Sequence, residues 1–265
     1  MSSSKPTWSS LAYQSLFETL GVFLIVFLGT AAVGAMTWTG ATFGQWEISI
    51  AWGVAVGVAV CVTAPFSGAH LNPAVTLALW AMRRTSTRSV LPFIAAQMLG
   101  GVAGAMASYA IYRTLILRFL SDHALRFDTP AILPVAGVFT TFAHAGLTIF
   151  DAFLVEMVIT AILMLVILVC ASEDRAAKQF MPMPLVVGLL VAVIGAATGP
   201  LTGFALNPAR DFGPRVWLVL MDWGPIVMTG GHAIAYAWVP VCAPVVGALM
   251  GAGIYQLTIG RHVTC

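Results

Sequence analysis

The chain has 265 residues, of which 60% are hydrophobic and 8% are charged, with a formal net charge of +2. Soluble globular domains carry about a quarter charged residues, so this composition excludes them and predicts an integral membrane protein. The small net charge carries little information about a nucleic-acid or acidic partner, and we expect no nucleic-acid partner. Most uncharged runs can hold a spanning helix of about 20 residues, and the alternating segments of a β-barrel are absent from the sequence.

In chain order, the sequence predicts an all-α membrane protein with six spanning helices and two half-helices. The spanning helices are expected at about 11–36, 48–64, 89–117, 151–171, 184–198 and 235–257, and the half-helices at 72–81 and 207–220. The apolar run 48–82 is too long for one span, and Pro65, Gly68 and Pro73 interrupt it. The segment 118–150 mixes charges, prolines and apolar residues and predicts no clear element.

One phrase occurs twice, as Ser-Gly-Ala-His-Leu-Asn-Pro-Ala and as Thr-Gly-Phe-Ala-Leu-Asn-Pro-Ala, and its asparagines, Asn72 and Asn207, are 135 residues apart. Asn is a favoured N-cap and Pro suits the first helical position, so Pro73 and Pro208 predict helices that start inside the membrane. Buried carboxylates, Gly-x-x-x-Gly pairs and other glycines recur at matching places; the pairs are Gly100/Gly104 and Gly247/Gly251.

These matches predict a single channel domain, 1–265, made of two repeats at about 11–117 and 151–258. Three spans per repeat place the two repeats in opposite orientations in the membrane. A ten-residue half-helix is about 15 Å long, half of a ~30 Å hydrocarbon core, so the two helix starts are expected to meet near the midplane. Lys and Arg are more frequent on the side of the termini, which predicts cytoplasmic termini.

The meeting point is predicted to be a polar path. The helix N-termini carry partial positive charge, which suits an anion or a neutral molecule and repels cations and protons. Because each cap oxygen is used by its own helix, the NH₂ groups of Asn72 and Asn207 are expected to donate to a passing solute. Non-helical backbone at membrane depth is tolerated where it lines an aqueous cavity. The expected carbonyl ladder, which suits a small hydroxylated solute, comprises Gly68, Ala69, His70, Leu71, Gly203, Phe204 and Ala205.

A constriction is predicted from Trp52, Phe204 and Arg210, which would offer the CH edge of a polyol an aromatic wall and its hydroxyls a guanidinium. Arg210 is the one Lys or Arg expected inside the core, where charged residues usually line a polar path. For Trp52, an anchor at the membrane interface is the alternative role. Asp211 is expected to satisfy outer-loop backbone and to orient the arginine.

Glu18 and Glu156 occupy matching places in the two repeats. The symmetric placement favours a structural role, in which each carboxylate accepts N–H bonds from the loop of its own repeat. The alternative is a proton relay in a coupled transporter. His70 is expected to brace its loop rather than bind a metal, and the scattered cysteines predict neither a disulfide nor a metal site. We expect no cofactor, and the core shows no nucleophile–base pair that would indicate an enzyme.

The paired Asn-Pro-Ala phrases, the duplicated Glu and Arg210 resemble the aquaporin, or major intrinsic protein, family over about 11–260. Segments 43–49 and 199–215 are similar to bacterial glycerol facilitators. Gly195 stands where water-selective members have a His, which leaves room for Phe204, and Asp211 and Pro240 also match the glycerol branch. Exclusion of protons by half-helix dipoles and a pore arginine is established for aquaporins.

The resemblance implies a passive channel for glycerol and related small neutral polyols, with some water passing, in the lipid bilayer of the bacterial inner membrane. It also implies a homotetramer with one pore per subunit. Two alternatives stay open at this point: a water-selective channel, and a proton-coupled transporter that uses Glu18 and Glu156.

Overall fold

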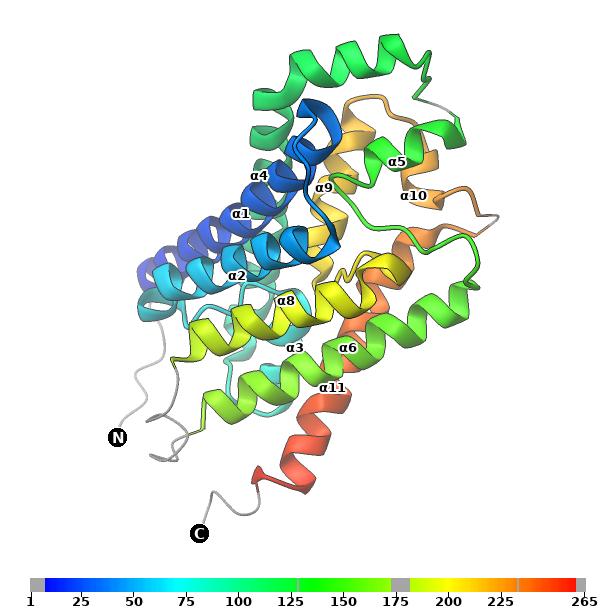
Figure 1. Cartoon of the computed structure of the whole chain (residues 1–265). Coiled ribbons are helices and arrows are strands. Elements are labelled where there is room, and N and C mark those ends of the chain that lie inside the picture. Colours follow the sequence, from blue (N-terminus) through cyan, green and yellow to red (C-terminus); the bar gives the residue numbers. More distant parts are fainter. Residues whose placement is uncertain (1–7, 128, 173–181, 233, 261–265) are drawn as a thin grey trace.

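The structure, a computed structural model, describes residues 8–127, 129–172, 182–232 and 234–260, and in that part of the chain it is helical with no strand. Six helices are long and apolar enough to cross a membrane (Figure 1). They are α1 (Trp8–Thr39), α2 (Gln45–Ser67), α4 (Thr87–Asp122), α6 (Ile149–Cys170), α8 (Met183–Thr202) and α11 (Val239–Leu257). Two shorter helices, α3 (Pro73–Ala81) and α9 (Pro208–Leu220), lie among them. The predicted all-α membrane fold is confirmed.

The helix contacts follow the same pattern in the two halves of the chain. Helix α1 packs against α4 and α2, and in the same way α6 packs against α11 and α8. Each half-helix contacts the last span of the other half: α3 lies against α11, and α9 lies against α4. Two contacts join equivalent elements, α2 with α8 and α3 with α9. This is the pattern that two repeats related by an approximate twofold axis produce.

Glycines permit the closest helix contacts. A Cβ added to Gly247 or Gly251 of α11 would collide with the backbone of α6 at Met157 and Ala161. Gly100 and Gly104 of α4 are equally close to the backbone of α1. The close approach predicted from the two Gly-x-x-x-Gly pairs is confirmed in both repeats.

Helices α2 and α8 are longer than the sequence predicts. They continue through Pro65 and Pro200 and end at Gly68 and Gly203, whose φ angles of 82° and 77° are left-handed C-caps. A proline removes one N–H and crowds the preceding turn, but here it lies in the last turn, and the glycine then closes the helix. Helix α4 also passes its predicted end and continues to Asp122, and its last turns carry the exposed ion pair of Arg118 and Asp122.

The segment 118–150, for which the sequence predicts no element, contains the end of α4 and two short helices, η1 (Pro130–Ile132) and α5 (Leu133–Ala136). A second connection carries α10 (Ile226–Thr229) and η2 (Tyr236–Trp238), and α10 contacts both α5 and α9. The buried ring of Phe139 anchors this layer among the rings of Trp38, Tyr109 and Trp223. The layer lies at the end of the molecule toward which α9 runs from its start at the centre (Figure 1).

The contact between α6 and α11 generates a stability prediction. Gly247→Val is expected to lower the free energy of unfolding by about 1–3 kcal/mol, because the new side chain meets backbone that cannot move aside. The measurement is the thermal unfolding midpoint of the detergent-solubilised protein. Gly253→Val is the control in the same helix, since a Cβ there meets nothing within 4 Å. Equal midpoints for the two variants would contradict the prediction.

Candidate functional site

The two half-helices begin as the sequence predicts. The side-chain oxygen of Asn72 accepts a hydrogen bond from the Ala74 N–H at 2.8 Å, and that of Asn207 accepts from the Ala209 N–H at 2.9 Å. Both asparagines have extended backbone, and a proline follows each at the first helical position. The predicted N-caps are therefore confirmed, and both helix N-termini open onto the same place.

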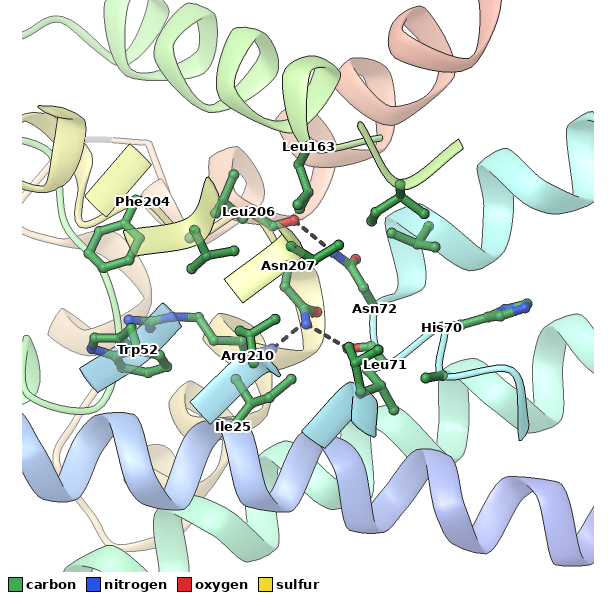
Figure 2. A pocket seen from close by; sticks show the side chains of 18 of the residues that line it. Ile25, Trp52, His70, Leu71, Asn72, Leu163, Phe204, Leu206, Asn207 and Arg210 are labelled. Atoms are coloured by element: carbon green, nitrogen blue, oxygen red, sulfur yellow. Dashed lines mark hydrogen bonds between the residues drawn. The ribbon is translucent and has the colours of Figure 1, made fainter. Parts of the chain in front are cut away.

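The asparagines also join the two halves of the chain. The Asn72 amide donates to the Leu206 carbonyl at 2.9 Å, and the Asn207 amide donates to the Leu71 carbonyl at 2.7 Å (Figure 2). One N–H of each amide is therefore used between the two halves of the chain, a contact that the sequence did not predict. The second N–H of each amide stays available for a molecule in the cavity.

The loops that precede the half-helices share one backbone conformation. Ala69 and Leu71 have φ angles of 50°, and Phe204 and Leu206 have φ angles of 42° and 58°. These left-handed values cost a non-glycine residue about 1–2 kcal/mol each. Because the loops cannot pair within a helix, fixed partners elsewhere must hold them.

Two buried carboxylates hold the loops. Glu18 accepts the N–H groups of His70 at 3.0 Å and Leu71 at 2.6 Å. Glu156 accepts those of Ala205 at 2.9 Å and Leu206 at 3.0 Å. Ser67, Thr202 and Gln97 supply further donors; the first and third bond to Glu18, and the second bonds to Glu156. The predicted contacts are confirmed, because each carboxylate accepts N–H groups from the loop of its own repeat.

A cavity of about 70 Å³ lies where the half-helices meet. One side is apolar, with side chains from α1, α2, α6 and α8; they include Ile25, Val56, Val60, Leu163, Val187 and Val191. The other side is formed by the loop residues 69–72 and 204–207 with Arg210 (Figure 2). The cavity thus presents hydrocarbon on one wall and hydrogen-bonding groups on the other.

The loop carbonyls differ in their partners. Those of Leu71 and Leu206 accept the asparagine bonds. Within the described residues, the carbonyls of Ala69, His70, Phe204 and Ala205 accept no hydrogen bond from the protein, and all four residues line the cavity. The prediction for Gly68 and Gly203 needs correction, because these helix C-caps are outside the cavity lining.

The three residues of the expected constriction lie together at one end of the cavity (Figure 2). The Arg210 guanidinium carbon is 4.0 Å from the Trp52 ring centroid, and the Trp52 and Phe204 rings are edge-on with centroids 6.3 Å apart. Trp52 is only 3% exposed, which argues against the alternative of a lipid-interface anchor. Arg210 Nη1 is buried without a hydrogen-bond partner in the described structure, so it can donate to a ligand.

Gly195 lies directly beside the Phe204 ring. A Cβ at this position would come within 2.8 Å of Phe204 Cζ and 2.9 Å of Ser49 Oγ. Its carbonyl accepts a hydrogen bond from Gln45 Nε2 at 2.8 Å, which fixes the backbone there. A larger residue at 195 therefore excludes the ring position that Phe204 occupies.

A sequence model of the major intrinsic protein family matches residues 6–255. The chain belongs to the major intrinsic protein family. It is 46% identical over 256 residues to the glycerol uptake facilitator protein of Haemophilus influenzae, covering 97% of each chain. It is 44% identical to the propanediol uptake facilitator of Citrobacter freundii, covering 97% of this chain and 95% of the relative. The X-ray structure of the aquaglyceroporin from Plasmodium falciparum superposes with a TM-score of 0.83 at 31% identity, covering 96% and 99% of the two chains.

In this major intrinsic protein, Asp211 forms its ion pair with Arg215 and not with Arg210. It accepts the N–H and the hydroxyl of Thr141, both at 2.7 Å, so it does satisfy outer-loop backbone. Its ion pair, however, is with Arg215, at 2.5 Å, and among the described residues it makes no hydrogen bond to Arg210. The expectation that Asp211 orients Arg210 is therefore corrected.

Arg215 is the residue that the sequence reasoning missed. It is fully buried, donates to the carbonyls of Thr141 and Val227, and contacts the rings of Phe142 and Tyr236. It thereby ties both outer connections to α9. The available signal was the four-residue spacing from Asp211, which puts the two charges on one face of a helix.

His70 braces its loop, as expected. Its Nδ1 lies 3.1 Å from Thr76 Oγ1, and its ring meets Phe93 edge-on at 5.1 Å. Thr76 also accepts from Gln97 at 3.0 Å, so the brace is continuous with the Glu18 contacts. In the described part of this family member, no three His, Cys, Asp or Glu side chains gather as metal ligands would.

The carboxylate contacts generate a second stability prediction. Glu156→Gln is expected to lower the free energy of unfolding by about 1–3 kcal/mol, because an amide NH₂ replaces one acceptor and leaves a buried loop donor unpaired. Thermal unfolding of the purified protein measures the effect. Glu47→Gln is the control, since this exposed residue closes a capping box in which Gln serves equally well. A midpoint as high as that of the control would show that the carboxylate does not hold the loop.

Proposed function

We propose that this protein is a passive channel for glycerol and related small neutral polyols, with some water passing, and that it excludes ions and protons. The observation that carries the proposal is the constriction of Trp52, Phe204 and Arg210, with Gly195 beside it. Two ring surfaces suit the CH groups of a polyol, and an unpartnered guanidinium N–H suits its hydroxyls. The names of the relatives, which include glycerol uptake facilitators, support the same solute class.

Passage depends on exchange of hydrogen bonds along one wall of the cavity. The carbonyls of Ala69, His70, Phe204 and Ala205 accept from hydroxyls, and the second N–H groups of Asn72 and Asn207 donate at the centre. The aliphatic wall opposite faces the carbon skeleton of the solute. Each hydroxyl therefore replaces water bonds with protein bonds, which keeps the cost of dehydration low.

Charge exclusion follows from the positive ends of α3 and α9 together with Arg210. Each helix N-terminus acts as roughly half a positive charge, and both point at the asparagine pair. Arg210 adds a full charge one turn further along α9. Exclusion of cations and protons by such a barrier is established for aquaporins.

We further propose the assembly and orientation. The chain acts as one channel domain, 1–265, whose inverted repeats span about 11–117 and 151–258, and the matched helix contacts support this division. An even number of spans puts both termini on one side, and three exposed arginines, Arg83, Arg84 and Arg88, lie on that side. This favours cytoplasmic termini in a bacterial inner (plasma) membrane. The other cations counted on that side, Lys5, Arg175, Lys178 and Arg261, lie outside the described residues. Family resemblance supports a homotetramer.

Light-scattering stopped flow tests the function. Proteoliposomes with the purified protein, placed in a glycerol gradient, should shrink and then reswell faster than empty vesicles. Reswelling no faster than in empty vesicles, with fast water exit retained, would favour the water-selective alternative. A proton-coupled transporter predicts that an uncoupler abolishes uptake, whereas the channel predicts no change with the uncoupler.

Arg210→Ala is expected to raise proton conductance by about tenfold or more, since two unit charges about 4 Å apart interact by up to about 4 kcal/mol at an effective dielectric constant of ~20. A pH-sensitive dye inside the vesicles reports proton entry. Arg118→Ala, at the exposed end of α4, is the control because its charge is paired with Asp122 outside the cavity. Proton entry equal to that of the control would contradict the role of Arg210.

A further inference from the structure

The Trp52 ring occupies space that a glycine of α1 leaves free. A Cβ added to Gly29 would fall on the ring atoms Cδ2, Cε2 and Cε3 of Trp52. Gly29 is buried on the face of α1 that also carries Glu18 and the cavity-lining Ile25. Any larger residue at this position must therefore displace the indole.

The second aromatic of the constriction is seated in the same way. Phe204 lies against Gly195 of α8, where a Cβ would come within 2.8 Å of the ring. Each ring thus packs against a glycine of a neighbouring helix, in space that a side chain would otherwise fill. The aromatic surfaces at this end of the cavity therefore depend on two glycines, Gly29 and Gly195.

At the positions equivalent to Gly29 and Trp52, the other repeat has a larger residue on the first helix and a smaller one on the second. Glu18 and Glu156 are 138 residues apart in the sequence, and the same offset relates Ile25 to Leu163 and Gly29 to Ile167. The offset of the Asn-Pro phrases, 135 residues, relates Trp52 to Val187. Ile167 and Val187 both line the cavity. A glycine and a tryptophan in one repeat therefore correspond to an isoleucine and a valine in the other.

The Phe204 seat follows the same rule. Gly195 and Phe204 correspond to Val60 and Ala69 in the first repeat, and these two also line the cavity. At both places, a glycine in one element is paired with a large aromatic residue in its neighbour, whereas the other repeat has two aliphatic residues. One end of the cavity becomes a constriction through this exchange, while the other end keeps small aliphatic walls.

We propose that Gly29 is a specificity-determining position, which sets how far the Trp52 ring stands into the path of the solute. This inference rests on the proposed function. Trp52 lies between the α1 ribbon and the Arg210 guanidinium (Figure 2), whose carbon is 4.0 Å from the ring centroid. The ring has no free space behind it at Gly29, so added volume there moves it toward Arg210 and Phe204. The opening then narrows, and glycerol is hindered more than water.

The test compares glycerol and water permeability in the same proteoliposomes. Gly29→Ala is expected to lower the glycerol-to-water permeability ratio by about tenfold, equivalent to about 1.4 kcal/mol in the barrier. Gly253→Ala is the matched control, a glycine in a spanning helix whose added Cβ meets nothing, and its ratio should equal that of the wild type. Adding Trp52→Phe to Gly29→Ala removes ring volume and should return the ratio to within about twofold of the Trp52→Phe value. A merely structural role for Gly29 predicts no such rescue.

A second pair keeps the inference testable if Gly29→Ala folds poorly. Gly29→Ile with Trp52→Val copies the Ile167–Val187 pair, and it should elute as the wild type does and admit larger polyols than the wild type admits. The inference would be overturned if Gly29→Ala kept the wild-type glycerol-to-water permeability ratio. It would also be overturned if adding Trp52→Phe failed to return that ratio to near the Trp52→Phe value, or if the Gly29→Ile, Trp52→Val variant misfolded. If wild-type vesicles pass water but no glycerol, the proposed function fails by itself. Gly29 is then judged by whether Gly29→Ala lowers water permeability and Trp52→Phe restores it.

Discussion

Two non-helical loops at the centre of a membrane protein have to be hydrogen-bonded by something other than water, and two carboxylates meet this requirement. Glu18 and Glu156 each accept two consecutive loop N–H groups and a hydroxyl. An unpaired backbone group in hydrocarbon costs several kcal/mol, so without these acceptors the left-handed loops could not persist. The half-helix starts, the cavity and the position of Arg210 all depend on these loops.

The cavity combines a symmetric centre with asymmetric ends. The asparagine caps, the loop conformations and the carboxylate contacts occur in both repeats with closely similar geometry. The constriction does not: tryptophan, phenylalanine and arginine stand where the other repeat has Val187, Ala69 and Val75. A duplicated frame therefore supplies the polar path, and a few substitutions in one copy supply discrimination between solutes.

Features that depend on one stretch of chain could be predicted from the sequence, and features that depend on the register between distant helices could not. The Asn-Pro starts follow from local capping chemistry, and the residues of the constriction follow from their depth in the membrane once the repeat is recognised. The carboxylate contacts follow from symmetric burial. The bonds from Asn72 to Leu206 and from Asn207 to Leu71, the burial of Arg215 and the seat at Gly29 require knowledge of which elements touch. Helix ends were missed where a proline suggested an earlier stop.

The reciprocal asparagine bonds also bear on the type of transport. Transporters built from inverted repeats work by alternating access, in which one repeat rocks against the other around a central site. Here the two repeats are hydrogen-bonded to each other at the central site itself. Each asparagine donates to a carbonyl of the opposite loop, at 2.9 Å and 2.7 Å. Rocking would have to break both of these buried bonds. The bonds therefore favour a conduit whose throughput is set by the shape of its walls and not by the rate of a conformational cycle.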